Sequence, residues 1–195
     1  MLSGVSPTKG RLLVATPVLD DPNFDRTVIF VVEHHDEGAL GLILNRPSTE
    51  SLNDPLDGWV SAQSEPAHVF SGGPVEPDAL IALARVGSEI RRSPDEDDET
   101  SYLAPLAGEI ASADLAADPA LVVGSITELR VFRGYAGWAS GQLEAEIESG
   151  SWIVLDSETA DVFTADPDEL WRAVLRRQPG RLGWLADVPD DLAWN

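Results

Sequence analysis

The sequence predicts an α+β fold (layered α/β): one compact domain, residues 1–195, in which a few helices pack on a curved mixed β-sheet. Three observations predict it. Segments rich in β-branched and aromatic residues outnumber those with helical periodicity. Strands and helices do not alternate regularly, and no internal repeat or linker divides the chain. With 43% hydrophobic residues, the chain is long enough to bury a substantial core.

The N-terminal part of the chain predicts three strands. Residues 10–19 (GRLLVATPVL) and 26–34 (RTVIFVVEH) carry the branched and aromatic side chains that suit a pleated, buried surface. Residues 38–45 (GALGLILN) follow the turn HDEG and place a leucine at every second position. The second and third segments are therefore expected to form a hairpin.

The middle of the chain predicts further strands on both sides of a charged loop. Residues 67–73 (AHVFSGG), 79–86 (ALIALARV) and 121–134 (LVVGSITELRVFRG) have strand character. The run near 91–101 is acidic, poor in apolar residues and interrupted by Pro94. We expect this run to be a mobile, solvated loop.

The stretch FRGYAGWASGQLEAEIESGSW, residues 132–152, predicts a corner followed by a short helix. Gly134 and Gly137 suggest a tight turn, so Gly137→Val should cost several kcal/mol or abolish folding. Residues 142–149 predict the helix, with Gly150 as its C-terminal cap. We expect the helix to bury two apolar side chains and to expose two acids: Leu143 and Ile147, and Glu144 and Glu148.

The C-terminal part predicts one strand and one helix. Residues 152–156 (WIVLD) have strand character, and residues 164–180 contain the helix. Asp166 is expected at the N-cap and Pro167 at the first helical position. The helix should end before Pro179-Gly180. Its buried stripe is expected to contain Trp171, Val174 and Leu175.

Composition and charge argue against several classes of function. Thirteen basic and 34 acidic residues give a formal net charge of −21, so direct binding of nucleic acid is not expected. The apolar runs are far shorter than the roughly 20 residues that span a bilayer, and the first residues lack a signal-peptide pattern. We therefore expect a cytoplasmic protein with no membrane association. The chain has no cysteine, which excludes disulfides and thiolate chemistry.

We identify no catalytic or metal-binding motif in the sequence. His34 and His35 are adjacent on a predicted strand, where their side chains would point to opposite faces. No HExxH motif, GxSxG elbow or nucleotide-binding glycine motif accompanies them. We therefore expect no metal site and no cofactor.

Eight residues form a candidate ligand groove. Asn45 and Arg46 end a predicted strand, where guanidinium donors could meet a carboxylate or phosphate. The alternative is that Asn45 caps a turn and Arg46 pairs with an acid. Gly72 and Gly73 could present backbone N–H groups to an anion, or could simply permit a turn. The other four candidates come from the predicted corner and helix: Tyr135, Trp138, Gln142 and Glu146.

Three blocks of sequence resemble the AlgH/YqgE family of bacterial proteins. In order, they are GRLLVATPVLDDPNFDRTVIFVVEHHDEGALGLILNRP, VFSGGPVEPDAL and FRGYAGWASGQLEAEIESGSWIVLD, and the resemblance extends from Gly10 to about Leu185. Residues 93–126 match the family pattern only loosely. The resemblance implies a compact α/β protein with a mixed sheet. Some members are named transcriptional regulators, but the resemblance implies no catalytic residue and no cofactor.

Two classes of function follow. The first is a non-catalytic binding or regulatory module that recognises a protein partner or a small ligand in a groove formed by the LNRP, SGGPV and GYAGW loops. The second is an enzyme in which Arg46 binds a small anionic substrate and His34 or Glu33 is the general base. A pocket that holds Arg46, His34 and Gly73 together would favour the enzyme. Separate packing roles for the three would favour the module.

Overall fold

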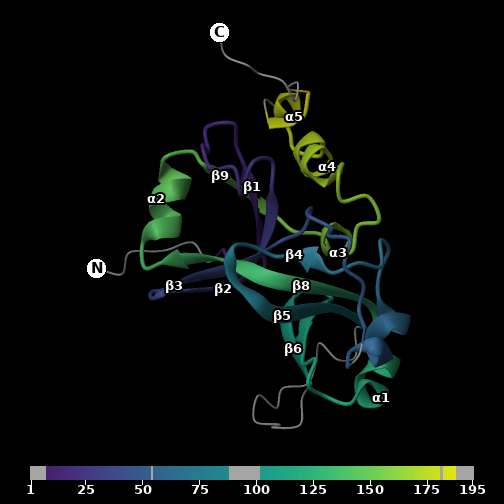
Figure 1. The fold of residues 1–195 in the computed structure, drawn as a ribbon. Coiled ribbons are helices and arrows are strands. Elements are labelled where there is room, and N and C mark those ends of the chain that lie inside the picture. Colours follow the sequence, from purple (N-terminus) through teal and green to yellow (C-terminus); the bar gives the residue numbers. More distant parts are fainter. Residues whose placement is uncertain (1–7, 54, 88–101, 181, 188–195) are drawn as a thin grey trace.

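A bent β-sheet organises the structure, a computed structural model that describes residues 8–53, 55–87, 102–180 and 182–187 (Figure 1). The strands are β1 (Arg11–Ala15), β2 (Val28–His35), β3 (Gly38–Ile43), β4 (Phe70–Ser71), β5 (Val75–Val86), β6 (Leu103–Ala107), β7 (Ile110–Ala113), β8 (Ile126–Ala139) and β9 (Trp152–Asp156). Their order is β6-β7-β5-β8-β3-β2-β1-β9 with antiparallel neighbours, and β4 pairs in parallel with β8. The predicted α+β fold with a curved mixed sheet is confirmed.

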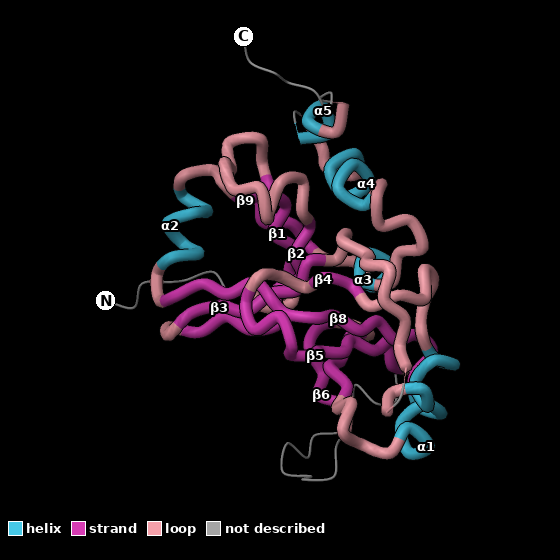
Figure 2. Tube along the Cα trace, viewed as in Figure 1, coloured by secondary structure: helices cyan, strands magenta, loops and turns pink. Residues whose placement is uncertain are grey.

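Short helices gather around the sheet and do not alternate with its strands (Figure 2). They are the 3₁₀ helices η1 (Asp57–Ala62) and η3 (Val123–Ser125) and the α-helices α1 (Pro119–Val122), α2 (Gln142–Glu148), α3 (Thr159–Val162), α4 (Leu170–Arg176) and α5 (Leu182–Leu185). In the part of the chain that the structure describes, no helix has the length and apolarity needed to cross a bilayer.

The predicted hairpin of β2 and β3 is confirmed. His35 pairs with Gly38 across a two-residue turn, and the register continues to Ile29 opposite Ile43 with one irregularity. The first five residues of β2 are all buried, although successive side chains point to opposite faces. This pattern arises because apolar side chains cover both faces of the sheet at this position.

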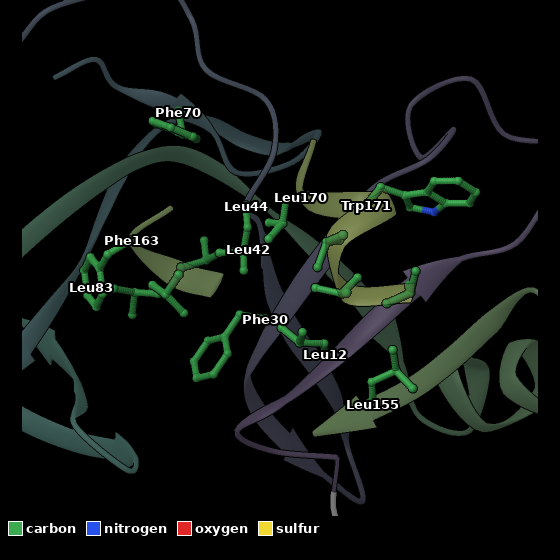
Figure 3. Packing of buried hydrophobic residues seen from close by; sticks show 14 of the residues in the cluster. Leu12, Phe30, Leu42, Leu44, Phe70, Leu83, Leu155, Phe163, Leu170 and Trp171 are labelled. Atoms are coloured by element: carbon green, nitrogen blue, oxygen red, sulfur yellow. The ribbon is translucent and has the colours of Figure 1, made fainter. Parts of the chain in front are cut away.

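The larger core lies between the sheet and the helices α3 to α5 (Figure 3). Trp171, Val174 and Leu175 form the buried stripe of α4, as predicted. The Trp171 indole also donates a hydrogen bond from Nε1 to the carbonyl oxygen of Ala15 at 2.9 Å, so this large side chain is buried without an unsatisfied donor. The strands contribute large apolar side chains to the same core, among them Leu12, Phe30, Leu42 and Leu83.

Helix α2 covers the opposite face of β1, β2 and β3. Leu143 is buried there, as predicted, and Ile147 is half-buried against the same cluster. Gly150 follows the helix with a φ of +80°, which fits its predicted role as a C-terminal cap. A third cluster of apolar side chains joins η1 and α1 to the β5, β7 and β8 part of the sheet.

The predicted corner at residues 134–138 is wrong, because this stretch belongs to β8. Strand β8 pairs with β5 as far as Tyr135, and its residues Ala136–Ala139 pair with β3. Gly134, with a φ of +67°, lies opposite an irregularity in the β5 register between Val75 and Leu80. The glycine therefore bends the strand without ending it.

Close backbone packing explains both glycines of the GGP motif and the first glycine of the GYAG motif, Gly134. A Cβ atom at Gly72 would lie 2.3 Å from the carbonyl oxygen of Gly134, and one at Gly73 would lie 2.2 Å from the carbonyl carbon of Tyr135. Neither position leaves room for a side chain. The two motifs thus meet in space where β3, β4 and β8 converge.

Several element boundaries differ from the prediction. Helix α4 begins at Leu170, because residues 167–169 form a turn in which the Leu170 amide donates to Pro167 at 3.2 Å. The N-terminal part of the predicted strand 121–134 is helical, since Asp118 caps α1 by accepting from the Ala120 amide at 3.0 Å. The hairpin formed by β6 and β7 was not predicted from the sequence. The predicted acidic loop near 91–101 lies outside the described residues, which omit 88–101.

Candidate functional site

The structure distributes the eight candidate groove residues over three neighbouring places, and Trp138 belongs to two of them. Asn45, Arg46, Gly72 and Gly73 lie where β3 and β4 converge. Tyr135 lines a cleft on the face of β2, β3 and β8. The other three candidates form a hydrogen-bonded cluster at α2: Trp138, Gln142 and Glu146.

Asn45 has a packing role. Its side chain is 4% exposed, and its Oδ1 atom accepts a hydrogen bond from the Val28 amide at 2.9 Å. Its Nδ2 atom donates to the carbonyl oxygen of Arg26 at the same distance. Both groups of the amide are therefore engaged in joining β3 to the start of β2, as expected of a buried polar side chain.

Arg46 lines a pocket with residues of the second motif. The guanidinium donates to the carbonyl oxygens of Asn45, at 3.2 Å, and Asp25. The adjoining cavity has a volume of about 290 Å³, and we call it the Arg46 pocket. It is lined by Pro22, Asn23, Ile43, Arg46, Ser71, Gly73 and Pro74. The LNRP and SGGPV loops thus come together, as the groove hypothesis expected.

Glu146 anchors the cluster at α2. Its Oε2 atom accepts hydrogen bonds from the indole nitrogens of Trp138 and Trp152, each at 2.8 Å, and its Oε1 atom accepts from Gln142 at 2.9 Å. The two indole rings pack edge to face with centroids 6.0 Å apart. Neither Gln142 nor Glu146 lines the cleft beside Tyr135, so these candidates tie α2 to the sheet.

His34 is held between two partners beneath α2. Its side chain is 3% exposed, with Nδ1 2.6 Å from the Thr8 hydroxyl and Nε2 2.9 Å from the Glu144 carboxylate. The expectation that Glu144 only faces water is therefore wrong, because this acid is the ring's partner. Glu148, on the same helix, is exposed as predicted. The side chain of His35 points to the other face and is 65% exposed.

The constellation required by the enzyme hypothesis is not assembled. His34 pairs with Ala39 at one end of β3, whereas Arg46 follows the other end of that strand. At about 3.4 Å per residue, the part of β3 from Ala39 to Ile43 alone spans about 14 Å, and Arg46 follows three residues later. Glu33, next to His34, is equally remote from Arg46. Gly73 shares a pocket with Arg46, but His34 and Glu33 do not.

A shallow cleft lies on the opposite face of β2, β3 and β8. Glu33, Leu40 and Gly137 are aligned across these three strands. The cavity has a volume of about 450 Å³, and we call it the Tyr135 cleft. It is lined by Glu33, His35, Glu37, Gly38, Ala39, Leu40, Val75, Tyr135, Gly137 and Trp138.

The Tyr135 cleft combines an apolar floor with an acidic rim. Leu40, Val75 and Tyr135 are half-buried, whereas Glu33 and Glu37 are exposed. His35 lies 3.9 Å from Glu33 and is the one basic side chain among the cleft's lining residues. Gly137, which has no side chain, is exposed in this floor, with the Tyr135 ring and Val75 beside it. Such a cleft suits a ligand that is apolar along its length and positively charged at its end.

Comparisons with known proteins identify the family. A profile of the AlgH-like family matches residues 12–183. The chain belongs to the AlgH-like family. A UPF0301 protein from Streptomyces avermitilis is 43% identical over 100% of this chain and 98% of its own length. A UPF0301 protein from Thermobifida fusca is 46% identical over 95% of this chain and 94% of its own length.

Two solved structures share the fold of this AlgH-like protein. The crystal structure of a Corynebacterium diphtheriae protein superposes with a TM-score of 0.82 at 29% identity, covering 92% of each chain. The solution structure of AlgH from Pseudomonas aeruginosa gives a TM-score of 0.65 at 29% identity, covering 98% of this chain and 99% of AlgH. The resemblance inferred from the three sequence blocks is thereby confirmed.

Sequence reasoning missed the buried arginine of the AlgH-like fold. Arg130 is 1% exposed and donates to the carbonyl oxygens of Val162, at 3.1 Å, and Glu65, at 2.7 Å. Its guanidinium lies 4.3 Å from the centre of the Phe70 ring. Burial lowers the pKa of Arg130 to about 10, which still leaves the group charged at neutral pH. Its position within a predicted strand gave no signal for this role.

Proposed function

We propose that this AlgH-like protein is a non-catalytic cytoplasmic binding module that receives a basic side chain of a protein partner in the Tyr135 cleft. Regulation by the protein would then run through that partner. The observation that carries the proposal is Gly137, a glycine for which the fold has no evident requirement.

Gly137 differs from the other glycines of its motif. Its φ lies outside the left-handed region, and a Cβ atom there would meet the Tyr135 ring at 3.4 Å and Val75 at 3.6 Å, which are ordinary contacts. A glycine in a strand interior destabilises the strand by roughly 0.5–1 kcal/mol relative to alanine. The visible effect of its missing side chain is an open cleft floor, which supports a binding role.

The chemistry of the cleft favours a basic side chain. Lys and Arg combine an apolar stem, which would lie over Leu40 and Gly137, with a cationic head that would reach Glu33 and Glu37. The face of Tyr135 is a further partner for the cation. The net charge of −21 attracts a basic partner and repels nucleic acid, which supports a protein partner over direct DNA binding.

The contacts of the titratable residues support a non-catalytic role. Both ring nitrogens of His34 are engaged by Thr8 and Glu144, so this ring has no free nitrogen to accept a substrate proton. Among the described residues, no three His, Asp or Glu side chains are grouped as metal ligands.

A peptide array with a matched pair of variants tests the proposal. The labelled protein is applied to nine-residue peptides whose central residue is Arg, Lys, Glu or norleucine and whose other residues are uncharged. We expect retention by the Arg and Lys peptides, with binding weakened about tenfold or more by Gly137→Leu, which fills the cleft. Gly124→Leu is the control, because no atom lies within 4 Å of a Cβ at Gly124 and its φ is not left-handed.

Two results of the array would overturn the proposal. One is equal retention by the norleucine or Glu peptides, and the other is binding that Gly137→Leu and Gly124→Leu affect to the same extent. If the array supports the cleft, the same two variants then distinguish a specific partner from background in affinity capture from native lysate.

A further inference from the structure

Arg46 differs from several other arginines of this acidic protein. Arginines with a carboxylate within 4.0 Å include Arg11, Arg85, Arg133, Arg176 and Arg177. No carboxylate of the described residues lies within that distance of the Arg46 guanidinium, which contacts two backbone carbonyls. Although the chain has 34 acids, none of those in the described residues forms an ion pair with this guanidinium.

The two carbonyl contacts hold the guanidinium in a defined orientation. Asn45 is locked between β2 and β3 by its own side-chain hydrogen bonds, so its carbonyl oxygen is a rigid acceptor. Asp25 supplies the second acceptor from the loop before β2. A guanidinium has five N–H donors, so these two bonds leave three for other acceptors. A carboxylate bound there would form its bonds without first ordering the side chain.

Ser71 supplies another available donor in the same pocket. The Ser71 side chain is exposed, and its hydroxyl makes no hydrogen bond within the part of the chain that the structure describes. Its backbone amide donates a hydrogen bond to the carbonyl oxygen of Arg46 at 2.8 Å, which keeps the two residues adjacent. A rigid guanidinium and a nearby hydroxyl are donors suited to the two oxygens of one anion.

We infer that the Arg46 pocket binds a small aliphatic monocarboxylate. The carboxylate would accept from Arg46 and Ser71, and its apolar chain would contact the pocket walls formed by Pro22, Ile43 and Pro74. A multiply charged phosphate gains less from an apolar wall and is repelled more strongly by a net charge of −21. This site is independent of the proposed function, because the Arg46 pocket and the Tyr135 cleft share no residue.

Titration of the ¹⁵N-labelled protein with sodium butyrate tests the inference. Sodium phosphate and butyramide are titrated in parallel at constant ionic strength and pH. We expect saturable shifts of the Arg46 Nε–H resonance and of the Ser71 and Gly73 amides with butyrate. Butyramide, which lacks the charge, should leave these signals unchanged, and phosphate should bind more weakly than butyrate.

Variants separate the site from general ion binding. Arg46→Gln should weaken butyrate binding about tenfold or more, since it removes the charged hydrogen bonds. Arg11→Gln, the same substitution at an arginine paired with Asp156, should leave it unchanged. Ser71→Ala breaks no protein hydrogen bond in the described structure and should weaken binding several-fold, which keeps the test decisive if Arg46→Gln folds poorly.

Three outcomes of the titrations would overturn the inference, and so would one outcome of the variants. They are the absence of a saturable butyrate response, a response to butyramide as strong as that to butyrate, and phosphate binding tighter than butyrate binding. Loss of butyrate binding in Arg11→Gln equal to that in Arg46→Gln would also overturn it, because the response would then reflect overall charge.

Discussion

At the scale of single residues, two kinds of glycine occupy neighbouring positions in the central motifs. Gly72, Gly73 and Gly134 are required by backbone contacts that leave no space for a Cβ atom. Gly137 has both the space and the backbone conformation for a Cβ atom, so the turn conformation from which a severe effect of Gly137→Val was expected is not present. The same residue type therefore has a packing role at three positions and opens a cleft at the fourth.

This difference predicts opposite effects of two alanine substitutions. Gly137→Ala should change the free energy of unfolding by no more than about 1 kcal/mol, and in the stabilising direction, because alanine suits a strand better than glycine. Gly73→Ala should destabilise by more than about 2 kcal/mol, because its φ of +153° and its contact with Tyr135 both exclude a side chain. Urea denaturation of the two variants measures both values. Severe destabilisation by Gly137→Ala would contradict this prediction, because it would show that the fold requires a glycine at this position.

Several site candidates are polar side chains that have hydrogen-bond partners within the protein. Asn45, His34 and Glu146 are polar groups at positions that the fold buries or half-buries, and each has its hydrogen bonds satisfied by the protein. Burying such a group without partners costs about 1–3 kcal/mol. The requirement for partners is therefore sufficient to explain their contacts.

At the scale of elements, β8 and α4 differ in how their sequences specify them. Strand β8 changes partner along its length, from β5 to β3, and its internal glycine looked like the end of the strand. Helix α4 is specified by a local apolar stripe that meets the sheet directly. Local periodicity thus located α4, whereas the path of β8 depended on neighbours far away in the sequence.

The role of α4 predicts a large difference between two tryptophans of the C-terminal helices. Trp171→Ala should reduce the free energy of unfolding by about 3–5 kcal/mol, because the side chain is 3% exposed and its indole is hydrogen-bonded to Ala15. Trp184→Ala in α5 should change it by less than about 0.5 kcal/mol, since Trp184 is 72% exposed. Chemical denaturation followed by circular dichroism compares them. Similar effects of the two substitutions would contradict the packing of α4 on the sheet.

At the scale of the whole molecule, the sheet curls until its distant parts approach each other. The β6–β7 hairpin reaches the start of β1, where a Cβ atom at Gly10 would lie 2.7 Å from the Cβ of Ala107. These residues lie near opposite ends of the strand order.

The net charge of −21 predicts that salt stabilises the fold. Raising NaCl from 0.01 M to 0.3 M shortens the screening length from about 30 Å to less than 10 Å, which weakens repulsion between distant acids. Salt also screens ion pairs such as Arg11–Asp156, but exposed pairs of this kind contribute only about 0–1 kcal/mol each. We expect the thermal midpoint to rise by at least about 3 °C. A neutral solute at equal osmolality is the control, and a midpoint that falls with salt would refute this prediction.

The fold class, the family, the β2–β3 hairpin and the amphipathic helices could be predicted from the sequence alone. These features depend on local periodicity and on sequence motifs, which can be recognised without knowledge of tertiary contacts. The sequence also identified Arg46 and Gly73, which the structure brings to one pocket. Only the tertiary structure decided that Asn45, Glu146 and His34 are held by internal partners and that Tyr135 and Gly137 form a separate cleft with Glu33. The physical reason is that strand pairing and hydrogen bonding between distant segments set these contacts, and a sequence read along one chain does not contain their register.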